Sequence, residues 1–313
     1  MSAYPKEIFK AYDIRGIVGK SLTPEIVEAI GHAIGSEAVA RKQRSIVIGR
    51  DGRLSGPDLS AALARGIQKA GVDVVDVGRV ATPMLYFAAY HLGANSGVMV
   101  TGSHNPPEYN GLKMLLGSET LAGDAIQDLL KRLENNDLTH GEGRYSEHDI
   151  VEEYLNRIVS DLHLQRPLNI VVDCGNGVAG AFAPMLYRRL NCKVRELFCE
   201  VDGTFPNHPA NPTLPEGLKD LVAKVRDEHL DLGIAFDGDG DRAVLVDDKA
   251  RPVNPGILGA MLIEHYLGEH ASGAVVYDAR ASHIMPDTIT KLGGEGVRSK
   301  VGHSNIKALM LRA

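Results

Sequence analysis

The sequence predicts an α/β protein made of tandem three-layer α/β/α domains with mixed, largely parallel sheets. Two observations support this prediction. Short apolar runs typical of buried strands alternate with helix-length segments along the chain. Polar, glycine-containing loops follow several of these runs, and ligand-binding loops lie at the carboxyl ends of strands in such sheets. The 313 residues suffice for two or three domains.

The first domain is predicted to cover residues 1–145. A strand-like segment surrounds Phe9 and Ile14, and a helix begins at Thr23-Pro24, because Thr is a good N-cap and Pro suits the first helical turn. Further strands are predicted at 45–48, 72–77, 96–100 and 112–115, and helices at 24–40, 57–70, 83–91 and 124–133. The polar stretch 135–146 marks the domain boundary.

The second and third domains are predicted at residues 146–250 and 251–313. Helices are expected at 150–159, 181–190, 215–229, 255–267 and 285–292, and strands at 168–172, 232–236, 243–246, 274–277 and 294–297. Residues 175–180 match the G-x-G-x-x-G pattern of dinucleotide-binding proteins. Because Asp173 would repel a pyrophosphate there, we interpret the pattern as a tight strand-to-helix turn and keep a dehydrogenase as a distant alternative.

Composition excludes several classes of partner and location. The net charge is −6 and the sequence pI is about 6.1, with no basic cluster, so a nucleic-acid partner is not expected. No apolar run reaches transmembrane length, which argues against a membrane partner. Three cysteines without C-x-x-C spacing indicate free thiols in a reducing, cytoplasmic setting. Nothing in the sequence indicates an obligate protein partner.

A candidate nucleophile follows the predicted strand that ends at Val100. Residues 101–107, Thr-Gly-Ser-His-Asn-Pro-Pro, cannot continue as helix or sheet, since the two prolines fix φ and remove two N–H donors. Ser103 therefore stands on a rigid turn beside His104, and Lys113 follows ten residues later. This arrangement is typical of a presented oxygen nucleophile. We interpret Arg50 and Arg53, after another strand, as structural.

A candidate metal site lies between two further predicted strands. Asp237, Asp239 and Asp241 alternate with glycines, and three such carboxylates repel one another unless a cation lies among them. Hard oxygen ligands indicate Mg²⁺ or Ca²⁺. An EF-hand is excluded because its sixth and twelfth positions, which should be Gly and Glu, are Arg242 and Asp248.

The sequence resembles the α-D-phosphohexomutases, in their phosphomannomutase/phosphoglucomutase branch. The resemblance rests on TGSHNPPEYNGLK (101–113), DGDGDR (237–242) and KVGHS (300–304). It implies interconversion of hexose 1-phosphates and 6-phosphates of glucose or mannose, through a phosphoserine and a 1,6-bisphosphate. Small-molecule sugar phosphates are then the partners, and glucose 1,6-bisphosphate is the activator or intermediate.

The resemblance also assigns roles to individual residues. Ser103 carries the phosphate, and one Mg²⁺ is held by Asp237, Asp239, Asp241 and a phosphoryl oxygen on Ser103. The other catalytic residues are Arg15, His104, Lys113 and Arg242, with Lys113 as a general acid/base. Arg280, Lys300 and His303 are expected to contact the sugar phosphate.

The resemblance implies that the chain lacks the end of the family's third domain and the whole of its fourth domain. We therefore expect a truncated form with weak or absent mutase turnover. Three alternatives remain open: a phosphoglucosamine mutase, a metal-dependent phosphatase and a non-catalytic sugar-phosphate-binding fragment. The first is disfavoured because the serine loop begins Thr-Gly-Ser and not Ser-Ala-Ser.

Overall fold

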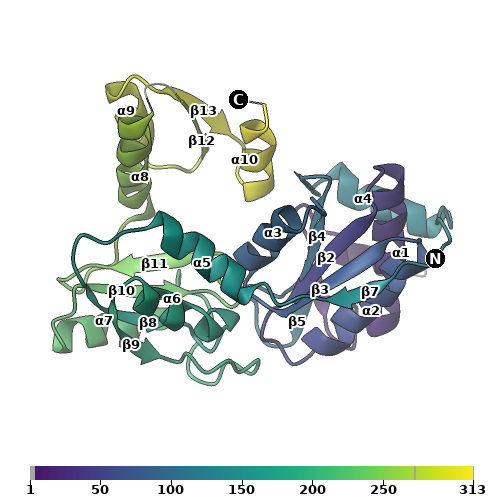
Figure 1. Cartoon of the computed structure of the whole chain (residues 1–313), viewed down its shortest axis with the longest axis horizontal. Coiled ribbons are helices and arrows are strands. Elements are labelled where there is room, and N and C mark those ends of the chain that lie inside the picture. Colours follow the sequence, from purple (N-terminus) through teal and green to yellow (C-terminus); the bar gives the residue numbers. More distant parts are fainter. Residues whose placement is uncertain (1–3, 271–272, 313) are drawn as a thin grey trace. The chain divides into compact units, whose positions relative to one another are not determined.

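The structure, a computed structural model, describes residues 4–270 and 273–312. The chain divides into two compact units, residues 1–251 and 252–313, and Figure 1 labels their helices and strands.

The first sheet of the first unit is mixed. Its strand order is β1 (Ile14–Ile17), β5 (Tyr109–Leu116), β4 (Gly97–Val100), β2 (Ser45–Arg50), β3 (Asp73–Arg79) and β7 (Tyr145–Glu147), with β6 (Glu119–Thr120) paired to β5. The pairs β4–β2, β2–β3 and β3–β7 are parallel, whereas β1–β5 and β5–β4 are antiparallel. The carboxyl ends of β4 and β2 therefore lie side by side.

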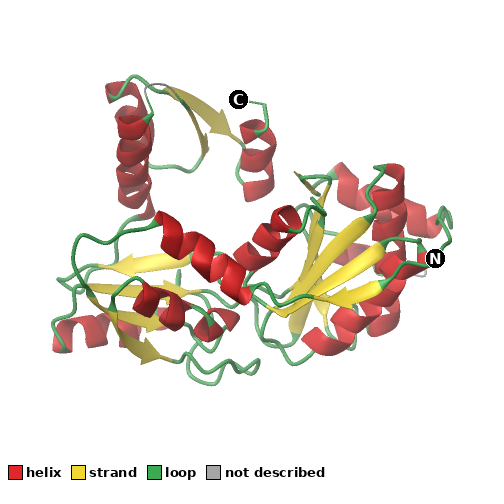
Figure 2. Cartoon of the chain, in the orientation of Figure 1, coloured by secondary structure: helices red, strands yellow, loops and turns green. Residues whose placement is uncertain are grey.

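Helices cover both faces of this sheet (Figure 2). One face packs on α1 (Pro24–Ala40), α2 (Gly56–Lys69) and α4 (Asp124–Glu134), and the other packs on α3 (Thr82–His91). The fully buried strand β4, Gly-Val-Met-Val, has core on both faces, which is why it reads as a continuous apolar run. The short 3-10 helix η1 (Lys6–Ile8) precedes β1.

The second sheet of the first unit has the order β11 (Ala243–Val246), β10 (Leu232–Phe236), β8 (Asn169–Asp173) and β9 (Lys193–Leu197). Only the β10–β11 pair is antiparallel. One face packs near α6 (Ala183–Arg189) and η2 (Val178–Ala181), and the other packs on α7 (Lys219–Asp227), which follows η3 (Pro215–Gly217). Helix α5 (Val151–Asp161) contacts both α3 and α6.

The second unit is small. Strands β12 (Ala274–Asp278) and β13 (Glu295–Ser299) are parallel. Helices α8 (Pro255–Glu269) and α9 (Ile284–Lys291) pack together, and α10 (His303–Met310) contacts both strands. The side chain of Asn254 caps α8 by accepting a hydrogen bond from the N–H of Gly256.

The predicted α/β class with mixed, largely parallel sheets is confirmed. Several local features were not predicted. Strands β6, β7 and β9 and helices η1 and α10 are additional elements. The helices predicted at 181–190 and 215–229 are shorter, and each follows a 3-10 turn. The predicted boundary after Tyr145 falls within β7, which pairs with β3.

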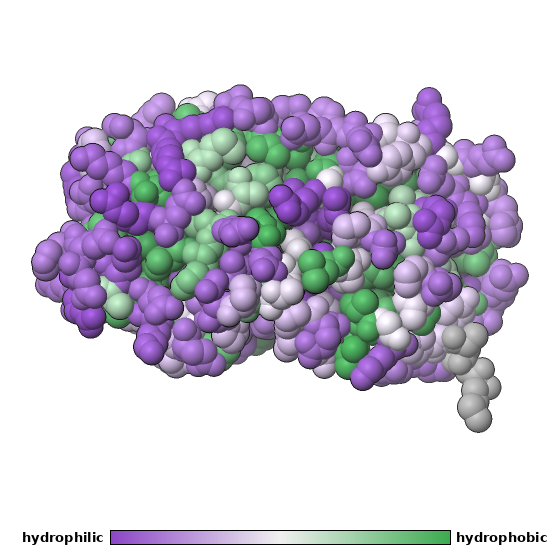
Figure 3. Space-filling model, turned by 90° about the horizontal axis from the view of Figure 1, so that it is seen from below, coloured by the Kyte–Doolittle hydropathy of each residue, from purple (hydrophilic) through white to green (hydrophobic). Residues whose placement is uncertain are grey.

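The surface is that of an ordinary globular protein. On the face shown in Figure 3, hydrophilic side chains predominate, and hydrophobic ones occur in small groups between them. Among the described residues, no helix combines the length and the apolar character that a membrane crossing requires.

Candidate active site

The candidate nucleophile lies on the serine loop, residues 101–108, which connects β4 to β5. Ser103 is only 2% exposed, and its φ of +49° places it in the left-handed region that non-glycine residues seldom adopt. Its backbone N–H donates to the Thr101 hydroxyl at 2.8 Å. A constrained backbone at a functional loop requires support from outside the loop.

Arg53 supplies that support from the loop after β2. Its side chain is fully buried, and its two terminal nitrogens donate to four backbone carbonyl oxygens. The acceptors are Pro106 (2.6 Å) and Tyr109 (2.9 Å) for Nη1, and Ser103 (2.9 Å) and Asn105 (2.6 Å) for Nη2. The planar fork of the guanidinium thereby fixes the path of the serine loop.

Asp51 completes this buried network. Its Oδ2 accepts hydrogen bonds from the Thr101 hydroxyl at 2.7 Å and from the Gly102 N–H at 3.2 Å, and lies 3.3 Å from Arg53 Nε. Burial raises the pKa of Asp51, while Arg53 and the hydrogen bonds oppose this effect. The partners thus offset only part of the effect of burial on this carboxyl group.

Two glycines allow the loops to approach this closely. A Cβ at Gly102 would lie 2.3 Å from the Cζ of Arg53. A Cβ at Gly238, in the aspartate loop (residues 237–242), would lie 2.4 Å from the carbonyl oxygen of Ser103. Both positions therefore exclude any side chain while the present packing persists.

The aspartate loop brings two buried carboxylates to the serine. Ser103 Oγ donates to Asp237 Oδ2 at 2.9 Å. Asp239 Oδ2 accepts from the Thr82 hydroxyl at 2.6 Å, and the N–H of Thr82 donates to the Asp239 carbonyl at 2.9 Å. The first residue of α3 thus positions the middle aspartate of the loop.

Lys113 reaches the same loop from the middle of β5. Its Nζ donates to Asp239 Oδ2 at 2.6 Å and to Asp241 Oδ2 at 2.5 Å, and the side chain is largely buried. Burial alone would lower the pKa of Lys113, but the two carboxylates outweigh it and raise the pKa. The side chain is therefore a cation in this arrangement.

The pKa values of Asp237 and Asp239 are shifted in opposite directions. Burial and the charges of Asp239 and Asp241 raise the pKa of Asp237. Burial would also raise the pKa of Asp239, but Lys113 and Thr82 outweigh it and bring that pKa to about 2. Asp237, which accepts the hydrogen bond from Ser103, therefore lies in the electrostatic field of two further carboxylates.

The aspartate loop fits a divalent cation. Asp237, Asp239 and Asp241 each offer a carboxylate oxygen, and these atoms lie within 4.8 Å of one another. Asp239 Oδ1 is buried without a hydrogen-bond partner. A buried carboxylate oxygen without a partner is costly, and a hard metal ion would satisfy it.

The remaining candidates of the first unit surround the serine. Arg15 Nη1 donates to the Gly102 carbonyl at 3.1 Å, and its Nη2 pairs with Asp13. His104 Nδ1 lies 3.3 Å from Ser103 Oγ, and burial together with Arg242 and Arg15 lowers the pKa of His104. The side chain of Arg242 is about half exposed, and its Nε lies 3.9 Å from Asp241 Oδ1.

Arg280, Lys300 and His303 belong to the second unit. Arg280 follows β12, and its Nη2 lies 3.4 Å from Asp278 Oδ2. Lys300 follows β13, and His303 is the first residue of α10. All three side chains are exposed. Their expected contact with a sugar phosphate stays a prediction.

The glycine pattern at 175–180 forms a tight turn. Gly175 has a φ of +47°, and its N–H donates to Asp173 Oδ1 at 2.9 Å. His208 Nε2 lies 3.2 Å from both oxygens of the same carboxylate. The negative charge of Asp173 is thus held inside the turn, as expected for the structural interpretation of this pattern.

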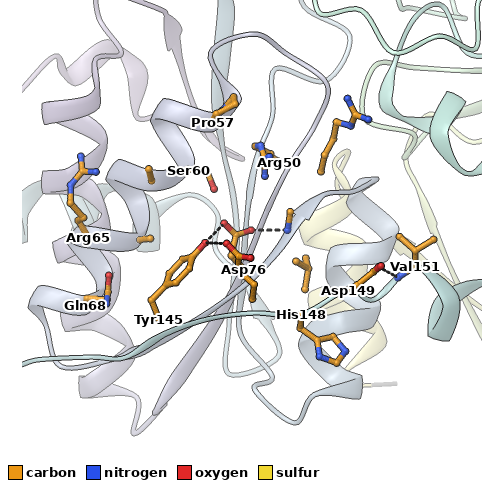
Figure 4. Close-up of a pocket in the computed structure, with 16 residues that line it drawn as sticks. Arg50, Pro57, Ser60, Arg65, Gln68, Asp76, Tyr145, His148, Asp149 and Val151 are labelled. Carbon is orange, nitrogen blue, oxygen red and sulfur yellow. Dashed lines mark hydrogen bonds between the residues drawn. The ribbon is translucent and has the colours of Figure 1, made fainter.

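The cavity in Figure 4 is not lined by the candidate catalytic or metal-binding residues. Its volume is about 730 Å³, and it lies beside α2, β3 and β7. Tyr145 donates there to Asp76 at 3.0 Å, and the neighbouring wall carries Arg50, Ser60 and Arg65. The residues of the serine and aspartate loops are absent from its described lining.

Sequence reasoning did not identify Asp51 or Thr82 as part of the site. Their partners lie 50 and 157 positions away in the chain, so no local pattern reveals them. Arg53 was interpreted as structural, and its contacts are of that kind, but their target was not predicted. The sequence feature that could have indicated this network is the run Arg-Asp-Gly-Arg (50–53) at the end of an apolar strand.

The family models and known proteins that match this sequence cover nearly the whole chain. Sequence models of the phosphoglucomutase/phosphomannomutase α/β/α domains I, II and III match residues 6–140, 152–250 and 254–313. A phosphomannomutase/phosphoglucomutase of Pseudomonas aeruginosa is 48% identical over 306 residues, which are 98% of this chain and 66% of that protein. A phosphoglucomutase of Neisseria meningitidis is 46% identical over 310 residues, 98% of this chain and 67% of that protein.

A solved structure is also similar to this chain over nearly its whole length. The phosphoglucomutase/phosphomannomutase family protein of Burkholderia thailandensis superposes with a TM-score of 0.96 at 44% identity, covering 99% of this chain and 69% of that one. The chain thus spans about two thirds of the length of the curated relatives it matches.

Proposed function

Because this chain belongs to the phosphoglucomutase/phosphomannomutase family, we propose that it takes part in interconverting the 1-phosphates and 6-phosphates of glucose and mannose. The reaction proceeds through a phosphate on Ser103 and a hexose 1,6-bisphosphate. One observation carries the proposal: Ser103 Oγ donates to Asp237 at 2.9 Å, at the edge of three converging carboxylates. The relatives' printed names support the choice of sugars.

The metal of this proposal is Mg²⁺, held by Asp237, Asp239 and Asp241. When bound, it would offset the negative charge of the phosphoryl group in transfer. The charges of Lys113 and Arg242 act in the same direction, because both lie beside the aspartate loop. Arg15 and Arg53 hold the carbonyls of Gly102 and Ser103, which keeps the serine in one place.

Proton transfer is assigned to the groups around Ser103. His104 is the better proton acceptor, since its lowered pKa favours the neutral imidazole within 3.3 Å of the hydroxyl. Lys113 is the better proton donor, since its raised pKa keeps the ammonium charged. The chemistry needs both roles, because the serine is dephosphorylated and rephosphorylated in one cycle.

The sugar phosphate is assigned to residues of three proposed domains, 1–145, 146–250 and 251–313. Domain one supplies Ser103 and its supports, and domain two supplies the aspartate loop. Domain three supplies Arg280, Lys300 and His303, which are exposed cations or donors suited to phosphate and hydroxyl groups. Glucose 1,6-bisphosphate is the proposed intermediate and the donor that first phosphorylates Ser103.

The test is a half-reaction read by mass spectrometry. Wild-type protein is incubated with glucose 1,6-bisphosphate and Mg²⁺, and then with glucose 1-phosphate. We expect one added phosphate that maps to Ser103 and leaves when the sugar monophosphate is supplied. Ser103→Ala should acquire none, whereas Ser160→Ala, which changes an exposed serine of α5, should behave as wild type.

Two outcomes would count against the proposal. A phosphate that maps to another residue would remove Ser103 from its role. Inorganic phosphate released without phosphorylated sugar would instead indicate the metal-dependent phosphatase.

A further inference from the structure

Two of the three cysteines bring their sulfur atoms into contact. Cys174 Sγ and Cys199 Sγ lie 3.5 Å apart as free thiols. A disulfide has an S–S distance of about 2.05 Å, so the sulfurs need to approach by only about 1.5 Å. Among the described residues, no hydrogen bond joins Cys192 to either partner.

Paired strands, not loose loops, hold the two thiols together. Cys174 directly follows β8, and Cys199 lies two residues after β9. These strands are parallel neighbours with Asp173 opposite Leu197, and the N–H of Cys174 donates to the Leu197 carbonyl at 3.1 Å. A bond between the sulfurs therefore needs side-chain rotation and no unfolding of the sheet.

The two cysteines differ in their access to solvent. Cys174 is completely buried, whereas Cys199 is half-buried. The hydrogen bond with Cys199, together with burial, raises the pKa of Cys174. An oxidant thus reaches Cys199 first, and Cys174 is placed to react second.

We propose that Cys174 and Cys199 form a site of reversible oxidative modification, with a hydroperoxide as the oxidant. The Cys199 sulfur attacks one peroxide oxygen, the O–O bond breaks, and an alcohol or water leaves while Cys199 becomes a sulfenic acid. The Cys174 sulfur then attacks the Cys199 sulfur. The S–O bond breaks, and water leaves with the Cys174 proton. The thiols together lose two electrons, which the peroxide gains.

The bond would change the second sheet's stability. It encloses η2, α6 and β9 in one covalent loop, which restricts the unfolded chain. Because such a loop lowers the entropy of the unfolded chain, the oxidised protein should unfold at a higher temperature than the reduced protein. The turn after Cys174 also contacts the aspartate loop, since the N–H of Val178 donates to the Gly238 carbonyl at 3.1 Å. This inference does not depend on the proposed function.

The experiment is peptide mapping of the whole chain without reductant. The protein is treated with hydrogen peroxide, quenched with catalase, and its remaining thiols are alkylated. We expect a mass lower by two hydrogen atoms before alkylation, and a linked pair of peptides that carry Cys174 and Cys199. Dithiothreitol should reverse both, and Cys192 should be alkylated throughout.

Variants separate the two steps and keep the outcome decisive. Cys192→Ser should form the same link as wild type, and Cys199→Ser should form none. In Cys174→Ala the Cys199 sulfenic acid should accumulate and be trapped by dimedone. The proposal is overturned if wild-type protein yields links through Cys192, links only between chains, or no link while its methionines become oxidised. The wild-type map decides this even if a variant does not fold.

Discussion

Arg53 is the residue on which the position of the nucleophile depends most. It binds four carbonyl oxygens around the serine loop and stacks on Phe205, with its Cζ 5.1 Å from the ring centroid. Lysine would keep the positive charge but would lose the planar guanidinium, whose two terminal nitrogens bind the four carbonyl oxygens. We expect Arg53→Lys to lower the free energy of unfolding by about 3–5 kcal/mol, because several buried carbonyls lose their donor.

The same substitution should slow phosphorylation of Ser103 about 100-fold, since small displacements of a reacting group have effects of that size. Urea unfolding and the mass-spectrometric half-reaction measure the two effects. Arg157→Lys, on the exposed face of α5, is the control and should change stability by less than about 0.5 kcal/mol. Wild-type stability in Arg53→Lys would show that the network is dispensable.

A second prediction concerns Asp239 and metal removal. Because Asp239 Oδ1 is buried without a partner, Mg²⁺ should stabilise the folded protein, by about 2.7 kcal/mol at a concentration 100-fold above its dissociation constant. A chelator should reverse the rise in unfolding temperature. Asp239→Asn should abolish the rise, while Asp128→Asn on the surface of α4 should retain it. An equal rise in both variants would place the metal elsewhere.

Among individual residues, the sequence predicted only those functional side chains that belong to a short, continuous motif. Ser103 and the three aspartates stand out because each motif lies within a few residues between two strands. The partner of Lys113 did not stand out, because β5 and the aspartate loop meet only in the folded chain. The sequence predicts a cation among the aspartates, and in the structure the ammonium of Lys113 pairs with two of the three, Asp239 and Asp241.

At the element scale, the proline-rich loop (residues 205–212) is held to β8 by one histidine. His208 Nε2 faces both oxygens of Asp173, and Nδ1 faces the Pro209 carbonyl at 2.9 Å, so both nitrogens meet acceptors. The hydrogen bond to Asp173 raises the pKa of His208 above its ordinary value of 6.5. The charged imidazole is therefore the form that the fold stabilises.

The sign of the pH effect follows from that shift. With a raised pKa in the folded state, the stabilisation is fully present below the ordinary value and is lost as the pH rises through the folded-state pKa. His208→Gln should therefore cost more stability at about pH 6 than at about pH 9. Urea unfolding at both pH values measures this, with the exposed His163→Gln as control. A cost that is equal at both, or larger at high pH, would contradict the assignment.

Elements with strong local signals were predicted, and those that depend on partners were not. Thr23 caps α1 as expected, because its hydroxyl accepts from the N–H of Ile26. The sequence of β9, Lys-Val-Arg-Glu-Leu, is largely exposed at an edge and lacks an apolar run. It becomes a strand because β8 offers a free edge.

At the scale of the whole molecule, the first unit holds every described large core. All four hydrophobic clusters lie between residues 8 and 246, together with both candidate loops. We expect residues 1–251 to fold alone and to keep the Mg²⁺-dependent rise in unfolding temperature. Circular dichroism during heating measures this.

Residues 1–145 provide the matched comparison. That segment ends within β7 and lacks Ile150 and Val178, which belong to the cluster beneath α3. We expect it to unfold at a lower temperature than residues 1–251 and to show no response to Mg²⁺. Equal stability of the two segments would mean that the first sheet does not rely on the second.

The contact between Gly102 and Arg53 also limits how this protein can vary. Any side chain at position 102 collides with the guanidinium, and any loss of the guanidinium releases the carbonyls of the serine loop. The effects of substitutions at the two positions therefore depend on each other. A side chain at position 102 fits only if Arg53 is first replaced by a smaller residue, and that replacement by itself already harms the protein. A saturation library should contain almost no active members at either position, and stepwise evolution would have to cross a defective intermediate to alter them together.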